Sequence, residues 1–215
     1  MNTMKKLFAV LFLFNAWLLS AQDHYFGPVA GVNLSNVSYS WNFIGINHEI
    51  YKAGITGGVE YEYIFKNGFN IGFDVLYDQR RHAYSDFSLV TYLYNYISCP
   101  LKIGYYTGKK FGVSVKGGAI PSYFINGYSK WEVYYYGDGL SSIDKDEIRK
   151  HDWAAFSEIG GRYNINNKLS LYSGLMFRHS FKKYYIINNV PRRPETYYRH
   201  YSYTWIFCLK YKMNR

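Results

Sequence analysis

The sequence predicts an all-β fold, namely an eight-stranded antiparallel up-and-down transmembrane β-barrel. Three features predict it: an N-terminal segment of the export type, a series of stretches in which apolar and polar residues alternate, and three tight polar turns separated by long connections. Strands that alternate between lipid and lumen, with short turns at one end and long loops at the other, are typical of such barrels.

Residues 1–21 have the parts of a secretory signal peptide. Lys5 and Lys6 form a basic start, an apolar run follows over 7–19, and small residues end the segment. This run is too short to cross about 30 Å of hydrocarbon as a helix, which disfavours the alternative of an N-terminal anchor helix. We therefore expect a cleaved signal peptide and an outer-membrane β-barrel domain over residues 22–215.

The composition agrees with an exported protein that has no membrane-spanning helix. Loss of the two N-terminal lysines lowers the formal net charge from +10 to +8, and no later segment approaches about 18 consecutive apolar residues. Aromatic residues make up 21% of the chain, and 26 residues are tyrosine, which favours membrane–water interfaces. A secreted β-sandwich and an outer-membrane barrel both fit this composition.

The first four strands are expected at about 25–38, 51–65, 69–80 and 94–106. The first is the weakest, with three apolar positions opposite glycine, asparagine and serine. In the second, the odd positions from Tyr51 to Phe65 are apolar or aromatic, whereas the even positions carry mostly lysine, glycine, threonine and glutamate. The third and fourth strands repeat this period of two, which is the period of a β-strand.

The last four strands are expected at about 111–119, 153–165, 169–179 and 201–211. The fifth sets phenylalanine and valine against glycine, serine and lysine, and the sixth sets Ile159 and Tyr163 against Arg162. The seventh is rich in leucine on one face. The eighth alternates aromatic and aliphatic residues with Ser202, Thr204 and Lys210.

Three tight turns join neighbouring strands at one end of the barrel. They are Lys66-Asn67-Gly68, Gly108-Lys109-Lys110 and Asn166-Asn167-Lys168. Each turn is followed at once by an apolar residue that opens the next alternating stretch, and each is preceded by another alternating stretch. With eight strands, both termini fall on the tight-turn side, which we expect to be periplasmic, and the long loops face outside.

The polar face of the strands carries charges of both signs together with many glycines. The inward charges are expected to be Lys52, Glu60, Glu62, Asp74, Asp78, Arg80, Lys102, Lys116, Glu158, Arg162, Arg178 and Lys210. Charges inside a barrel must be paired, and glycines leave room for the long side chains. An eight-stranded barrel is only just wide enough for its own side chains, so we expect a filled lumen and no open pore.

Two cysteines, Cys99 and Cys208, are the only ones in the chain. The alternation places Cys99 on the lipid side and Cys208 in the lumen, so no disulfide between them is expected. Both are interpreted as small apolar side chains that fill space.

No catalytic, cofactor-binding or metal-binding residues are predicted. The six histidines are scattered along the sequence: they are His24, His48, His82, His151, His179 and His200. His179 and Ser180 are neighbours on a strand and must point to opposite faces, which disfavours a base–nucleophile pair. Carboxylates at 144, 146 and 147 lack the spacing of a calcium loop.

The long loops over about 129–151 and 184–199 combine basic and aromatic residues. These are Lys130, Trp131, Tyr134, Tyr135 and Tyr136 in the first region, and Lys182, Lys183, Arg192, Arg193, Arg199 and His200 in and around the second. In an exported barrel such residues suit outer-membrane lipid and lipopolysaccharide headgroups better than nucleic acid. A solvated loop with an aromatic girdle is the simpler alternative.

Several segments resemble the PorT-like family of outer-membrane β-barrel proteins of Bacteroidetes. Residues 31–37 are similar to the G-x-N-x-S start of the family, and residues 73–80 are similar to its third strand. Residues 96–102 are similar to a family strand with a proline near its middle. The resemblance implies an eight-stranded barrel in the outer membrane, and it links some members to secretion and gliding machinery.

The expected function is therefore that of a structural or interaction barrel, not of an enzyme. It would serve as a membrane anchor or as an accessory to secretion or envelope assembly, and would act as a monomer with secretion or envelope proteins as partners. The alternatives are an outer-membrane lipid-modifying enzyme and a loop-mediated ligand binder. Fold alone does not decide among these classes.

Overall fold

A computed structural model describes residues 23–39, 48–85, 89–133, 137–143, 150–181 and 198–213. All ten strands in these ranges pair antiparallel in one sheet. They are β1 Asp23–Tyr39, β2 His48–Ile64, β3 Phe69–Ser85, β4 Leu89–Ser98, β5 Leu101–Gly108, β6 Phe111–Val133, β7 Gly137–Ser142, β8 His151–Asn164, β9 Leu169–Ser180 and β10 Tyr198–Met213. The described residues include no helix that is long and apolar enough to span a membrane.

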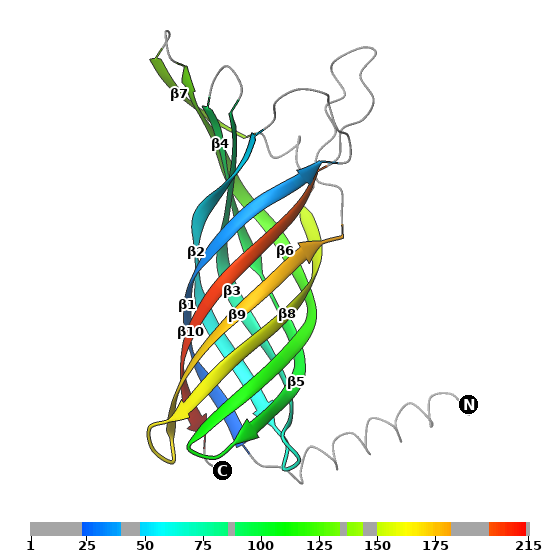
Figure 1. The fold of residues 1–215 in the computed structure, drawn as a ribbon, viewed down its shortest axis with the longest axis vertical. Helices are drawn as coiled ribbons and strands as arrows, with labels where there is room; N and C mark the ends of the chain where they lie inside the picture. The colour runs from blue at the N-terminus through cyan, green and yellow to red at the C-terminus, as the bar shows by residue number, and fades with distance from the viewer. Residues whose placement is uncertain are drawn as a thin grey trace, which may run out of the picture.

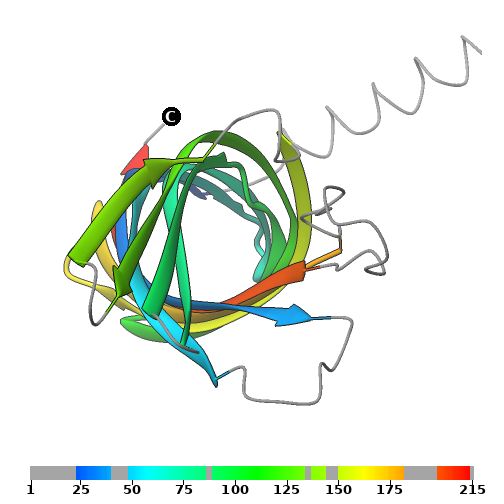
Figure 2. The same ribbon diagram turned by 90° about the horizontal axis from the view of Figure 1, so that it is seen from above.

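The sheet closes on itself into a barrel with an eight-strand circumference (Figures 1 and 2). Strands β1 and β10 close the ring, with pairs that run from His24–Met213 to Tyr39–Tyr198. Strands β4 and β5 share one position, because both pair with β3 on one side and with β6 on the other. The predicted eight-stranded antiparallel barrel is thus confirmed.

The predicted fourth strand is interrupted at Cys99 and Pro100. Proline has no backbone N–H to donate, so Pro100 cannot supply this hydrogen bond of the strand ladder. The interruption is bridged on both sides, since Cys99 N donates to Pro121 O at 2.9 Å and Asp74 N donates to Pro100 O at 3.0 Å. The wall of the barrel stays closed there although the regular strand stops.

Residues 129–133 and 137–142 are paired antiparallel as parts of β6 and β7, which contradicts the predicted loop over 129–151 in these described residues. Strand β6 continues far beyond the predicted end at residue 119 and pairs with β7 from Tyr128–Ser142 to Val133–Gly137. The hairpin projects beyond the barrel (Figure 1). Strands outside a membrane need no strict alternation between an apolar and a polar face, so this extension gave no period-two signal.

The three predicted turns are confirmed, and all lie at the end of the barrel that holds the C-terminus (Figure 1). Gly68 and Gly108 have φ angles of 86° and 125°, in the region that favours glycine. In the third turn, the Asn166 side chain accepts hydrogen bonds of 2.8 Å from the backbone N–H groups of Lys168 and Leu169.

The two faces of the wall have the predicted character. Outward side chains are large and apolar, for example Ile103, Ile159 and Trp205, which are 53%, 57% and 58% exposed. Inward side chains are largely polar or charged and are buried. Cys99 is half-buried, Cys208 is buried, and both are free thiols, in agreement with the absence of a bridge.

Candidate functional site

The interior of the barrel is lined by buried polar and charged side chains and is the best-defined candidate site. Eleven of the twelve charges predicted to point inward are buried. Lys52 is the exception: it lies near the start of β2, away from the tight turns, and is only half-buried. The buried charges form two separate clusters, which we call the lower cluster, near the tight turns, and the upper cluster.

The lower cluster has four acidic and four basic side chains, drawn from β2, β3, β5, β6, β8 and β10. They are Glu60, Glu62, Asp74, Glu158, Lys102, Lys116, Arg162 and Lys210. Lys210 Nζ lies 2.9 Å from Glu60 Oε1 and 2.8 Å from Glu62 Oε2. The cluster is electrically balanced when all eight groups are charged, as buried ion pairs require.

Tyr172 occupies the centre of the lower cluster. Its hydroxyl donates a hydrogen bond of 2.5 Å to Glu158 Oε1, and Lys116 and Lys210 place their Nζ atoms 4.5 and 4.6 Å from its ring centroid. A Cβ built on Gly174 would lie 2.7 Å from the Tyr172 hydroxyl oxygen. The glycine at position 174 therefore leaves room for the ring.

Arg162 forms the base of the lower cluster. Its guanidinium is sandwiched between the rings of Tyr25 and Tyr106, at 4.6 and 4.5 Å from their centroids, and donates to Glu62. Stacking of this planar cation on aromatic faces is favourable where water is excluded. These rings come from β1 and β5, so together with Tyr172 of β9 every strand position of the barrel contributes a side chain to this level.

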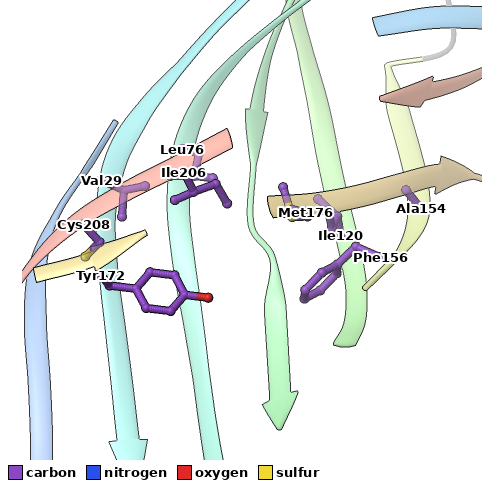
Figure 3. Close-up of a cluster of buried hydrophobic side chains, with 9 residues drawn as sticks. All are labelled: Val29, Leu76, Ile120, Ala154, Phe156, Tyr172, Met176, Ile206 and Cys208. Atoms are coloured by element: carbon purple, nitrogen blue, oxygen red, sulfur yellow. The ribbon is translucent and has the colours of Figure 1, made fainter. Parts of the chain in front are cut away.

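An apolar belt separates the two charged clusters. It consists of Val29, Leu76, Ile120, Ala154, Phe156, Met176, Ile206 and Cys208, packed with the ring of Tyr172 (Figure 3). In β3, the belt residue Leu76 lies between Asp74 and Asp78. In β9, Met176 lies between Tyr172 and Arg178, so the belt is one level of the interior and not a scattered set.

The upper cluster is organised by Arg80. Its guanidinium donates to Asp78 at 3.0 Å, to Asp152 at 2.6 Å and to Ser122 at 2.8 Å, and it lies 4.1 Å from the ring centroid of Tyr96. Arg178 pairs with the same carboxylate of Asp78. Two arginines and two aspartates balance each other here. The alternation missed Asp152 because the predicted strand began one residue later.

Beyond the upper cluster, on the side away from the tight turns, aromatic and imidazole rings pack against one another. His82 stacks on Tyr92 and Tyr94 with centroid distances of 5.2 and 5.7 Å, and the His200 ring lies 5.7 Å from that of His82. The histidines were interpreted as scattered, but the fold brings these two together from β3 and β10. Both histidines continue the inward-facing positions of the alternation in their strands. This alternation is the sequence signal from which their inward orientation could have been predicted.

Some of the other sequence-predicted residues lie within the described ranges, and the rest lie outside them. His179 and Ser180 point to opposite faces, as predicted, and the Ser180 hydroxyl donates to Asp152 Oδ2 at 2.7 Å. Lys130 donates to Glu132 at 2.8 Å, and this bond lowers the pKa of the exposed Glu132 carboxyl. Trp131, on the projecting part of β6, and Arg199, at the start of β10, are exposed. The predicted loop residues outside the described ranges are Tyr134, Tyr135, Tyr136, Asp144, Asp146, Glu147, Lys182, Lys183, Arg192 and Arg193.

Within the described ranges, no group of three or more histidine, cysteine, aspartate or glutamate side chains is arranged to hold a metal ion. The buried carboxylates of the lower cluster are instead held by ammonium and guanidinium groups, with Glu62 contacting Lys116 at 3.0 Å and Asp74 contacting Lys102 at 2.7 Å. This arrangement pairs each buried carboxylate with a cationic side chain and so neutralises the charge of the lower cluster.

The sequence model of one protein family, described as outer membrane protein beta-barrel domain, matches residues 20–190. No curated protein matches the chain. Among solved structures, OprG from Pseudomonas aeruginosa is similar at 14% identity and a TM-score of 0.49, with 91% of this chain and 98% of that chain covered. Ail of Yersinia pestis is similar at 11% identity and a TM-score of 0.42, with 89% of this chain and 100% of that chain covered. The outer membrane protease OmpT from Escherichia coli is similar at 8% identity and a TM-score of 0.40, with 89% of this chain and 97% of that chain covered.

Proposed function

Because this chain belongs to the family of outer membrane protein β-barrel domains, we propose that it is a structural or interaction barrel with a side-chain-filled lumen and no open pore. The buried and paired side chains of the interior support this role most directly. Two balanced charge clusters with an apolar belt between them leave the wall and the external loops as the surfaces for contact with other molecules.

The specific role that we propose is that of an accessory to secretion or envelope assembly. The resemblance of residues 31–37, 73–80 and 96–102 to PorT-like proteins supports it. The protein would act as a monomer, since β1 and β10 of a single chain close the ring. It would reach the outer membrane through cleavage of the signal peptide after residue 21, which N-terminal sequencing of the mature protein tests.

Deletion of the gene, followed by assays of surface-protein secretion and of membrane permeability, tests the accessory role. A secretion defect that the intact gene restores is the expected result. Altered lipid A with normal secretion would contradict it and would point to the alternative of a lipid-modifying enzyme. Normal secretion and normal permeability would also contradict the role.

The external loops are the proposed contact surface for lipopolysaccharide. Basic residues near a membrane surface attract anionic headgroups by about 1 kcal/mol each. Neutralisation of Arg192 and Arg193 should therefore weaken the association of purified barrel with lipopolysaccharide. Unchanged association would remove lipopolysaccharide from the proposed partners and leave the loops to a different ligand.

A further inference from the structure

Two hollows flank the third tight turn, at the end of the barrel opposite the projecting hairpin. The inner hollow has a volume of about 480 Å³ and the outer one of about 610 Å³. Asn166 and Asn167 line both hollows, so the turn is a shared wall between them. Short turns of outer-membrane barrels face the periplasm, which places both hollows on the inner side of the membrane.

The inner hollow carries an excess of positive charge. Lys109, Lys110 and Lys212 line it, and Asp23 is the one carboxylate among the described residues that line it. Asp23 is paired with Lys212, so no other carboxylate of the described lining residues faces Lys109 and Lys110. Both of these lysines are exposed. Such a hollow attracts anions.

The shared wall offers a hydrogen-bond donor in a fixed position. Asn166 Oδ1 accepts from the backbone N–H groups of Lys168 and Leu169, each at 2.8 Å, which leaves the amide Nδ2 as the end that can bind a ligand. The turn is held against β10, because Lys212 N donates to Lys168 O at 2.6 Å. A lysine-rich hollow next to a positioned amide N–H suits the oxygens of a phosphate group.

The outer hollow adds an apolar side to this polar wall. Besides the two asparagines it is lined by Lys168, Leu169 and Tyr211, and Tyr211 is 48% exposed on the outward face of the barrel. Lys110 Nζ, from the inner hollow, lies 5.9 Å from the ring centroid of Tyr163, which is also outward-facing. Tyrosines in these positions mark the boundary between hydrocarbon and headgroups.

We propose that the two hollows form a cradle for a phosphate-bearing group, with an anionic phospholipid of the periplasmic leaflet as its source. The phosphate lies between Lys109, Lys110 and Lys168 and accepts a hydrogen bond from Asn166. The acyl chains leave along Leu169 and Tyr211. This site lies at the opposite end of the barrel from the loops proposed to contact lipopolysaccharide and does not depend on that proposal.

Lipid binding to the purified full chain in uncharged detergent tests the cradle. Native mass spectrometry measures apparent dissociation constants for phosphatidylglycerol and phosphatidylcholine, with inorganic phosphate as a separate ligand and competitor. The variants are K109Q, K110Q and K168Q. The matched control is K66Q, because Lys66 is an exposed lysine on the same rim that lines neither hollow.

The expected result is tighter binding of phosphatidylglycerol than of phosphatidylcholine, weakened about fivefold by each cradle variant and unchanged in K66Q. Phosphate binding with the same dependence on the variants, but without preference between the lipids, would support the cradle with a soluble phosphate as its source. An equal effect of K66Q would overturn the site, since it would show a general effect of rim charge. The site would also be overturned if the cradle variants changed the binding of neither phosphate nor phosphatidylglycerol.

Discussion

The hydroxyl of Tyr172 donates a 2.5 Å hydrogen bond to Glu158 across the pair of strands β8 and β9. Glu158 has only more distant cationic neighbours, since Lys102 and Lys116 lie 3.5 Å from its oxygens. The tyrosine thus joins an acidic group to the two lysines that border its ring, Lys116 and Lys210. Its ring also packs with the residues of the apolar belt.

Substitution Tyr172→Phe should destabilise the barrel by about 1.5–3 kcal/mol, because a buried carboxylate loses its hydrogen-bond donor. Guanidinium unfolding from lipid vesicles, followed by tryptophan fluorescence, measures the change. Tyr203→Phe is the control, since Tyr203 faces outward and is 44% exposed. Equal midpoints for Tyr172→Phe and wild type would show that the hydrogen bond contributes nothing.

Substitution Gly174→Ala should displace the Tyr172 ring from its position in the lower cluster. The three atoms nearest to the new Cβ all belong to Tyr172, at 2.7 to 3.0 Å. We expect a loss of about 1–3 kcal/mol in unfolding free energy, as for overpacking in other cores. Gly57→Ala is the matched control, because its Cβ would meet nothing closer than Val29 O at 3.6 Å.

The loss from Gly174→Ala should be smaller when Tyr172 is already phenylalanine, because the closest contact of the new Cβ is to the hydroxyl oxygen. The coupling between the two substitutions is read from the four unfolding free energies of a double-mutant cycle. Strict additivity would mean that the glycine is needed for a different reason.

Substitution Lys210→Met should be the most harmful of the single changes. It leaves Glu60 and Glu62 buried without their closest ammonium group, a situation that costs about 3–5 kcal/mol. Loss of the heat-modifiable band shift on electrophoresis reports whether the barrel still folds. Lys130→Met makes the same change in the exposed pair with Glu132 and should leave the shift intact.

The double variant Lys210→Met, Glu60→Gln keeps this expectation testable if the single variant fails to fold. Removing one carboxylate together with one ammonium restores the balance of the lower cluster, so folding should recover in part. A double variant as defective as the single one would indicate that the balance of charge is not what the cluster requires from Lys210.

The wall of the barrel could be predicted from the sequence because the membrane imposes a strict rule on it. Each spanning residue faces either lipid or lumen, so Glu60 and Ile103 could be assigned to their faces from alternation alone. The rule ends at the membrane boundary. It therefore gave no signal for the hairpin of β6 and β7, and it did not anticipate the interruption at Pro100.

The pairing inside the lumen could not be predicted in the same way. Alternation shows that a side chain points inward, but the stagger of the strands decides which side chains meet. Arg80 reaches Asp152 from β3 to β8, and His82 meets His200 from β3 to β10. These contacts join residues more than 70 positions apart in the chain. Separating the charges into two clusters with an apolar belt required the full three-dimensional register.

Conductance of the purified barrel in planar lipid bilayers tests the filled lumen most directly. The measurement is made on full-length protein whose folding has been confirmed by the heat-modifiable shift. The paired clusters around Lys210 and Arg80, with the belt at Leu76 between them, lead us to expect no sustained conductance at any applied voltage that the bilayer withstands. Stable, stepwise channels of the folded protein would contradict a filled lumen.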